Sequence, residues 1–181
     1  MKSRVITVSA ISASLVAICL AVGIYVSFAD VFALIMSSVF VILPLYVRSY
    51  KGCVMSYLVG GILGLIFGWF NFVSSFVFPA YFAFFGLFPV VNCFLKDKKV
   101  KKYILHVIGL LWCVAAFYGI YFYYKFIMGL DFADLPDYLA WMSEYVVYAV
   151  GIFGTVFYFV YDRFITLIRI IIDRYLGKII K

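Results

Sequence analysis

Charged residues are scarce in this sequence. Of its 181 residues only 13% are charged, whereas 68% are hydrophobic and 22% are aromatic. A soluble domain carries about 25% charged and roughly 45–50% apolar residues. One core cannot bury so large an apolar excess, so we expect the surrounding medium to be lipid. The length allows six helical spans of about 20 residues with short connections and leaves no room for a soluble domain.

Residue types that carry catalytic or metal chemistry are also few. His106 is the only histidine, which excludes an HExxH metalloprotease by counting. No GxSxG elbow and no P-loop occurs. No carboxylate falls in the middle of a predicted span, which argues against an ion-driven pump. We therefore predict no enzyme activity, no cofactor and no metal site.

The four cysteines form no CxxC pair. Each lies within or beside an apolar segment, at Cys19, Cys53, Cys93 and Cys113. Buried cysteine mostly behaves as a small hydrophobe, so we interpret all four as packing residues or free thiols.

Six apolar runs alternate with short polar segments. We predict an all-α bundle with spans at about 5–28, 31–47, 53–70, 74–95, 103–128 and 145–161. Polar residues then recur every three or four positions over 162–181 among isoleucines and leucines, which predicts an amphipathic, basic helical tail that either lies on the membrane surface or extends the last span toward a partner. The first run ends in a small-x-small triplet, Ser27-Phe28-Ala29. Its 24 residues nevertheless favour a retained span over a cleaved signal peptide.

The basic residues lie between alternate spans. With the N-terminus in the cytoplasm, the inner segments hold 14 of the 15 lysines and arginines, and only Lys125 lies outside. The positive-inside rule therefore predicts a multi-pass protein of a cell membrane, of bacterial plasma-membrane type, with both termini cytoplasmic. Orientation accounts for the net charge of +7, so we expect membrane lipid and no nucleic acid among the partners.

Small residues recur every four positions in two of the runs. The rows consist of Gly60, Gly64 and Gly68 in the third run, and of Ser9, Ala13, Ala17 and Ala21 in the first. Such rows let helix backbones approach closely in lipid. We expect the glycine helix to lie at the centre of the bundle. The alanine row either packs against it or docks a separate membrane protein.

The fourth run contains two prolines, Pro79 and Pro89, with Gly86 between them. Prolines in a span indicate either an irregular helix beside a cavity or a helix that is merely bent.

Polar and aromatic residues gather at the predicted outer ends of the spans. They are Asp30, Trp69, Asn71, Tyr121, Tyr124, Lys125, Trp141 and Glu144. Aromatic walls with a few polar groups are the usual lining of a small-molecule site. An aromatic belt with ordinary loop residues explains the same pattern.

The stretch SAISASLVAICLA, with its Ala13-x-x-x-Ala17 row, is followed by ADVFALIMSSVF and LVGGILGLIFG. This arrangement resembles the substrate-binding S component of energy-coupling factor (ECF) vitamin transporters. The resemblance implies docking through Ala13, Ala17 and Ala21 onto a transmembrane coupling subunit, with ATPases in the cytoplasm and a small molecule or vitamin captured from outside. Two alternatives remain open: a structural or regulatory membrane protein without a ligand, and a lipid-handling protein that uses the irregular fourth span.

Overall fold

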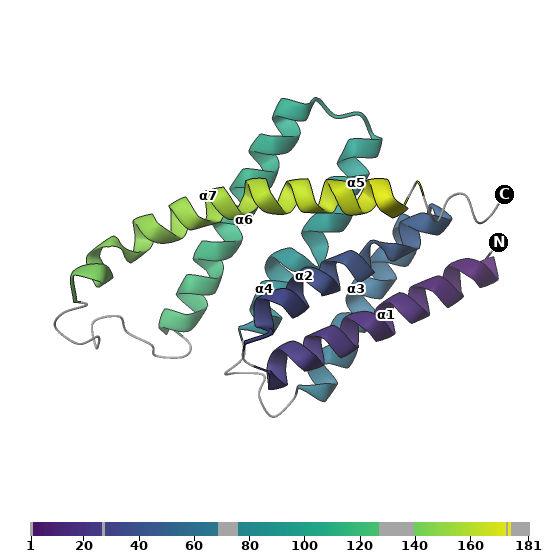
Figure 1. The fold of residues 1–181 in the computed structure, drawn as a ribbon, viewed down its shortest axis with the longest axis horizontal. Coiled ribbons are helices and arrows are strands. Elements are labelled where there is room, and N and C mark those ends of the chain that lie inside the picture. The colour runs from purple at the N-terminus through teal and green to yellow at the C-terminus, as the bar shows by residue number, and fades with distance from the viewer. Residues whose placement is uncertain (1, 27, 69–75, 127–139, 173, 175–181) are drawn as a thin grey trace.

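The computed structural model describes residues 2–26, 28–68, 76–126, 140–172 and 174, and all regular secondary structure within them is helical (Figure 1). In chain order the elements are α1 (Lys2–Tyr25), α2 (Asp30–Val41), the 3₁₀ helix η1 (Leu43–Val47), α3 (Tyr50–Phe67), α4 (Val77–Ala80), the π-helical turn η3 (Tyr81–Phe85), α5 (Leu87–Asp97), α6 (Lys102–Phe126) and α7 (Ala140–Ile171).

Six segments are long and apolar enough to cross a membrane. They are Ser3–Tyr25, Asp30–Val47, Tyr50–Phe67, Val77–Asp97, Lys102–Phe126 and Tyr148–Ile171. The predicted all-α class is thereby confirmed for the described residues, with six helices long and apolar enough to span a membrane. Apart from the end of the last span, the predicted limits differ from these by only a few residues.

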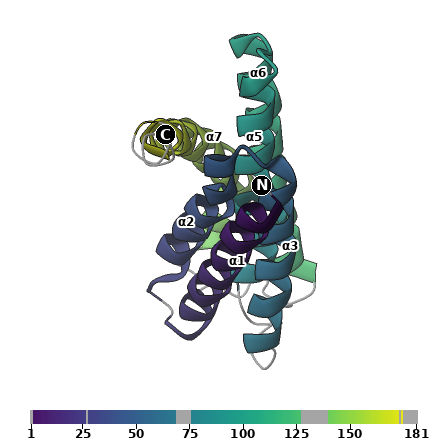
Figure 2. The same ribbon diagram turned by 90° about the vertical axis from the view of Figure 1, so that its right-hand side faces the viewer.

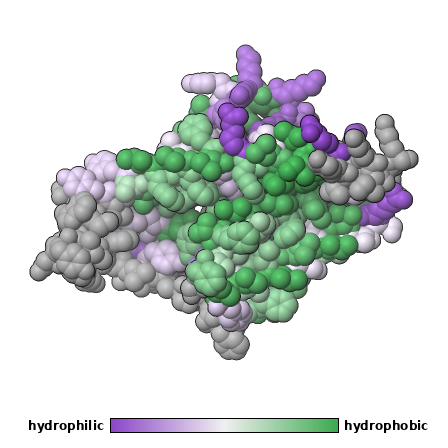
Figure 3. All heavy atoms as spheres, in the orientation of Figure 1, coloured by the Kyte–Doolittle hydropathy of each residue, from purple (hydrophilic) through white to green (hydrophobic). Residues whose placement is uncertain are grey.

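The spans alternate in direction, so the start of α1 and the end of α7 lie at the same end of the bundle (Figures 1 and 2). Basic residues collect there, at Arg4, Arg48, Lys51, Lys96, Lys98, Lys99, Lys101, Lys102 and Arg169. Figure 3 shows hydrophilic residues gathered at this end beside a broad hydrophobic surface. We call it the basic end.

The glycine row of α3 faces α1. A Cβ added to any of the three glycines would lie 2.5–2.7 Å from a side chain of α1. The contacts pair Gly60 with Val16, Gly64 with Leu20 and Gly68 with Ile24. Ala13 and Ala17 are only 3% and 2% exposed, so this part of the alanine row is covered by helices of the same chain. Ala21 is half-buried.

The fourth span, and not the glycine helix, lies at the centre of the bundle. In its most apolar stretch 67% of the residues are buried, against 33% in α3. The reason is that the opposite side of α3 carries exposed apolar side chains, including Leu58, Ile62 and Ile66. The glycine row therefore marks a close approach to one helix and does not mark burial on all sides.

The fourth span is irregular, as one of the two interpretations of its prolines expects. At the turn η3 the Gly86 amide donates to the Tyr81 carbonyl, five residues back, at 2.8 Å. Pro89 has no N–H, so the Phe85 carbonyl loses its usual helical donor. The Ser38 hydroxyl of α2 lies 2.8 Å from that carbonyl oxygen and replaces the donor.

Two further side chains donate to carbonyls of the same turn. The Tyr57 hydroxyl of α3 reaches the Phe82 carbonyl at 3.3 Å, and Trp112 Nε1 of α6 reaches the Ala83 carbonyl at 2.9 Å. An irregular backbone inside lipid is tolerated only where the protein supplies such partners. These bonds fix the rotation of α5 and thereby the direction of the polar side chains at its end.

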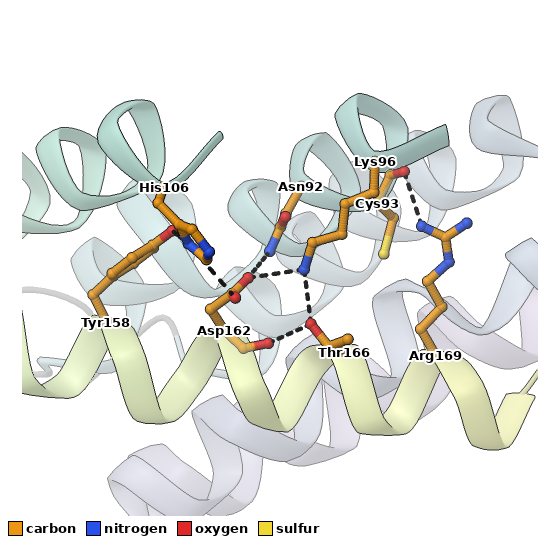
Figure 4. A network of polar contacts seen from close by, with 8 residues as sticks. All are labelled: Asn92, Cys93, Lys96, His106, Tyr158, Asp162, Thr166 and Arg169. Carbon is orange, nitrogen blue, oxygen red and sulfur yellow. Dashed lines mark hydrogen bonds and ion pairs between the residues drawn. The ribbon is translucent and has the colours of Figure 1, made fainter. Parts of the chain in front are cut away.

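Helix α7 continues without a break across residues 161 and 162, where we predicted the end of the last span and the start of a surface tail. The polar residues Asp162, Thr166 and Arg169 point toward α5 (Figure 4). The predicted boundary is thus wrong, because the polar stripe faces the interior of the bundle up to Arg169. Residues 175–181 of the predicted tail lie outside the described part of the chain.

Candidate functional site at the basic end

A buried carboxylate organises the basic end. Asp162 of α7 is only 5% exposed. Its Oδ1 accepts a hydrogen bond from Asn92 Nδ2 at 2.7 Å and an ion-paired one from Lys96 Nζ at 2.9 Å (Figure 4). The two donors lie one turn apart on α5, so both face the same point on α7. Asp162 therefore lies within the last candidate span, Tyr148–Ile171, and not just after its end as predicted, so the distribution of carboxylates no longer argues against ion coupling.

The network extends along α7 in both directions. Lys96 Nζ also donates to Thr166 Oγ1 at 2.7 Å, one turn beyond Asp162. On the other side, His106 of α6 lies with Nδ1 3.1 Å from the Tyr158 hydroxyl and 4.0 Å from Asp162 Oδ2. Three helices are thus joined through polar groups inside the apolar bundle.

A second polar cluster lies nearer the surface of the basic end. Asp97, at the end of α5, accepts hydrogen bonds from the Arg169 guanidinium and from the Tyr50 hydroxyl. Arg169 Nη1 also donates to the Cys93 carbonyl at 3.1 Å. The Asp97 charge is therefore balanced by Arg169, and α3, α5 and α7 are held together at their ends.

Beside this cluster lies a polar pocket of about 440 Å³, between η1 and the ends of α3, α5 and α7. Its lining consists of Leu45, Tyr46, Arg48, Tyr50, Asp97, Arg169 and Ile172. The Arg48 side chain is exposed, and no hydrogen bond or ion pair joins it to any residue that the structure describes. Among the described residues, the pocket therefore presents a cation without an acidic partner next to a carboxylate that is paired with Arg169.

Two apolar grooves adjoin the same end. The α3/α5 groove has a volume of about 540 Å³ and is lined by Tyr50, Lys51, Val54, Met55, Val90, Val91 and Phe94. The α1/α3 groove has a volume of about 270 Å³ and is lined by Val5, Ile6, Ser9, Ala10, Ala13, Lys51, Gly52, Met55 and Val59. Tyr50 belongs both to the polar pocket and to the α3/α5 groove, so these two spaces are neighbours.

Four of the residues predicted for substrate binding, Asp30, Tyr121, Tyr124 and Lys125, lie at the opposite end of the bundle. Tyr121 and Tyr124 of α6 are half-buried, and Lys125 is exposed. The Tyr124 ring lies 6.5 Å from that of Phe76. Asp30 begins α2, and its Oδ1 is buried without a hydrogen-bond partner among the described residues.

The other predicted substrate contacts cannot be assigned a geometry. Trp69 and Asn71 lie outside the described residues. Trp141 and Glu144 belong to α7, but their side chains are outside the described part. The predicted outward pocket therefore stays a prediction.

The sequence analysis missed the buried network. Its signal is a matched spacing: Asn92 and Lys96 are four apart on one helix, and Asp162 and Thr166 are four apart on another. Within the described residues no group of three or more histidine, cysteine or acidic side chains could hold a metal ion.

Comparison with protein-family models, with curated proteins and with solved structures finds no match to this chain.

Proposed function

We propose that this chain is the membrane-embedded, substrate-binding subunit of an ATP-driven small-molecule importer, similar to an ECF S component. It would have no catalytic activity of its own and would dock onto a transmembrane coupling subunit through its first span. The observation that carries the proposal is the α1/α3 groove, which opens along that span.

The groove suits the backbone of a partner helix. Four of its lining residues are small: Ser9, Ala10 and Ala13 of α1, and Gly52 of α3. Close helix approach in lipid depends on such residues, because apolar burial gives no net drive there. Ala17 and Ala13 are only 2% and 3% exposed and Ser9 is 8% exposed, so the docking surface proposed from the sequence is reduced to the exposed Ala10, nearer the basic end, with the buried Ser9 and Ala13 as further lining of the groove.

In this proposal the basic end faces the cytoplasm, following the positive-inside rule. The coupling subunit and its ATPases then meet the groove on the inner half of the membrane. The substrate enters from the opposite end, where Tyr121, Tyr124 and Lys125 of α6 lie. That arrangement supports capture on one side of the membrane and release on the other.

Two adjacent positions on α1 test the docking surface. Ala10 lines the groove, whereas Ile11 is 53% exposed and lies outside it at the same depth. The tagged full chain is purified from its native membranes in mild detergent, and the proteins and small molecules that come with it are identified by mass spectrometry. Ala10→Trp should abolish co-purification of a multi-pass subunit and its ATPases, and Ile11→Trp should leave it intact.

Equal co-purification by both variants would contradict the proposed docking surface. If the wild-type chain carries neither ATPase partners nor a small molecule, and a vitamin panel gives no thermal shift, the alternative of a structural membrane protein without a ligand replaces the importer.

A further inference from the structure

We propose that the basic end binds one anionic phospholipid of the surrounding bilayer, with its phosphate at Arg48 and one acyl chain in the α3/α5 groove. The inference does not depend on the importer function, because it concerns a different ligand, and its test positions, Arg48 and Val54, do not line the α1/α3 groove.

Arg48 lies close to two other sources of positive charge, the N-terminus of α3 and Lys51. It follows η1 in the left-handed conformation, with φ of 52°, and directly precedes the start of α3. The first turn of α3 contains no acidic residue and is capped by Ser49, whose hydroxyl accepts from the Gly52 amide at 3.0 Å. A helix N-terminus favours anions through its dipole and its free amides. Lys51, one turn away from Arg48, is exposed and adds a second cation.

The acidic residue of the pocket does not cancel this charge. Asp97 is already bonded by Arg169 and by the Tyr50 hydroxyl. A phosphate entering the pocket therefore meets Arg48 as its charged partner, with Asp97 held by the arginine behind it. Basic pockets between spans are a known type of site for anionic head groups.

The α3/α5 groove suits a flexible hydrocarbon chain more than a helix. Its apolar walls are large side chains, Val54, Met55, Val90, Val91 and Phe94, and it contains no small-residue row. A helix backbone could not approach as closely here as in the α1/α3 groove, where four lining residues are small. An acyl chain needs only continuous apolar surface.

Tyr50 joins the two parts of the site. Its ring lies edge-on to Phe94, with centroids 5.3 Å apart, and its hydroxyl lies 3.2 Å from the Cys93 carbonyl oxygen. Tyr50 lines both the polar pocket and the groove. Tyrosine prefers this depth, where the polar and apolar layers of a bilayer meet.

The test measures lipid binding to the full-length protein in mild detergent by native mass spectrometry and thermal shift. The probes are phosphatidylglycerol, phosphatidylcholine with the same acyl chains, and glycerol phosphate without chains. Arg48→Gln removes the proposed phosphate contact, and Arg4→Gln removes an exposed arginine elsewhere at the basic end. Val54→Trp fills the groove, and Ile62→Trp places the same side chain on exposed α3 surface outside it.

We expect phosphatidylglycerol to bind more tightly than phosphatidylcholine, and the difference to shrink as salt rises. Arg48→Gln should weaken phosphatidylglycerol binding about fivefold, in line with about 1 kcal/mol for one basic residue near a lipid surface. Val54→Trp should weaken binding of both lipids, and the two control variants should match the wild type.

Three results would overturn the proposal: equal affinity for the two lipids, equal effects of Arg48→Gln and Arg4→Gln, or glycerol phosphate binding as tightly as the intact lipid. The last result would show a site for a soluble anion. If Val54→Trp fails to fold, the Arg48→Gln comparison decides alone, because that side chain is exposed and its loss leaves no described partner unpaired. A wild-type chain that binds phosphatidylglycerol as expected but carries neither ATPase partners nor a small molecule would reject the importer and leave the lipid site standing.

Discussion

Lys96 of α5 and Asp162 of α7 form an ion pair, Nζ to Oδ1 2.9 Å, inside a largely apolar bundle. The lysine side chain is 24% exposed and the aspartate side chain 7%, so the carboxylate is the more deeply buried partner. A charge at this depth is retained at a cost in desolvation, which its partners must offset. The ion pair therefore stabilises the contact between α5 and α7 only while both residues are present.

Removing one member of the pair should be costly. Asp162→Asn leaves the Lys96 ammonium without its counter-ion, and breaking a buried pair in this way destabilises by about 3–5 kcal/mol. We expect the lower end of that range, because Lys96 is partly exposed. The measurement is unfolding of the purified protein in mixed detergent. Arg163→Gln, an exposed position on the same helix, should have almost no effect.

The triple variant Lys96→Met, Asn92→Leu and Asp162→Leu provides the complementary test, because Asn92 also donates to Asp162 and would otherwise be left unpaired. Replacing a buried pair and its polar neighbour by apolar groups of similar size is often close to neutral, so most of the lost stability should return. A triple variant as unstable as Asp162→Asn would contradict this account of the ion pair.

The donors to the π-helical turn should be individually measurable. Ser38→Ala removes the hydroxyl that bonds the Phe85 carbonyl and also leaves the Tyr161 hydroxyl, 2.6 Å away, without its acceptor. We expect a loss of about 2 kcal/mol in unfolding free energy, because buried polar groups are left unpaired. Ser14→Ala is the control, since that hydroxyl is exposed and bonds only within α1. Equal losses from the two variants would refute the assigned role of Ser38.

Two glycines make a matched pair for the helix contact. A Cβ at Gly60 would lie 2.7 Å from Val16, so Gly60→Ala should destabilise by about 1–3 kcal/mol through overpacking. Gly119 of α6 has no atom within 4 Å of such a Cβ, so Gly119→Ala should stabilise by up to about 1 kcal/mol through helix propensity. The two variants are compared by thermal unfolding. A stabilising Gly60→Ala would contradict the tight approach of α1 and α3.

The proposed orientation of the protein in the membrane can be tested by thiol labelling. In a background without native cysteines, Lys101→Cys should be protected from an impermeant reagent on intact cells, and Lys125→Cys should be labelled. The two positions lie at opposite ends of α6, at Lys101 just before its start and Lys125 near its end. The reverse pattern would place the basic end outside, and the proposed importer would then have its capture side facing the cytoplasm.

The spans were predictable from the sequence because hydropathy and length alone decide whether a helix can cross a bilayer. The partners of a polar residue depend in addition on how each helix is rotated. The polar stripe of α7 has the same spacing whether it faces water or another helix. Its residues Asp162, Thr166 and Arg169 face a helix only because α5 lies beside them. The same limit applies to the glycine row, which predicts a close contact without predicting what covers the other side of α3.

The irregular turn of the fourth span has a consequence for how the protein is made. Its carbonyls are bonded by Ser38, Tyr57 and Trp112, which come from α2, α3 and α6. Inserted into a bilayer by itself, this segment would leave those oxygens facing hydrocarbon. During synthesis two of the three donors emerge before the turn, and Trp112 emerges after it. The second and third spans, which supply Ser38 and Tyr57, are thus available to bond the carbonyls of the fourth span as it leaves the ribosome. The fifth span, which supplies Trp112, then adds the last donor.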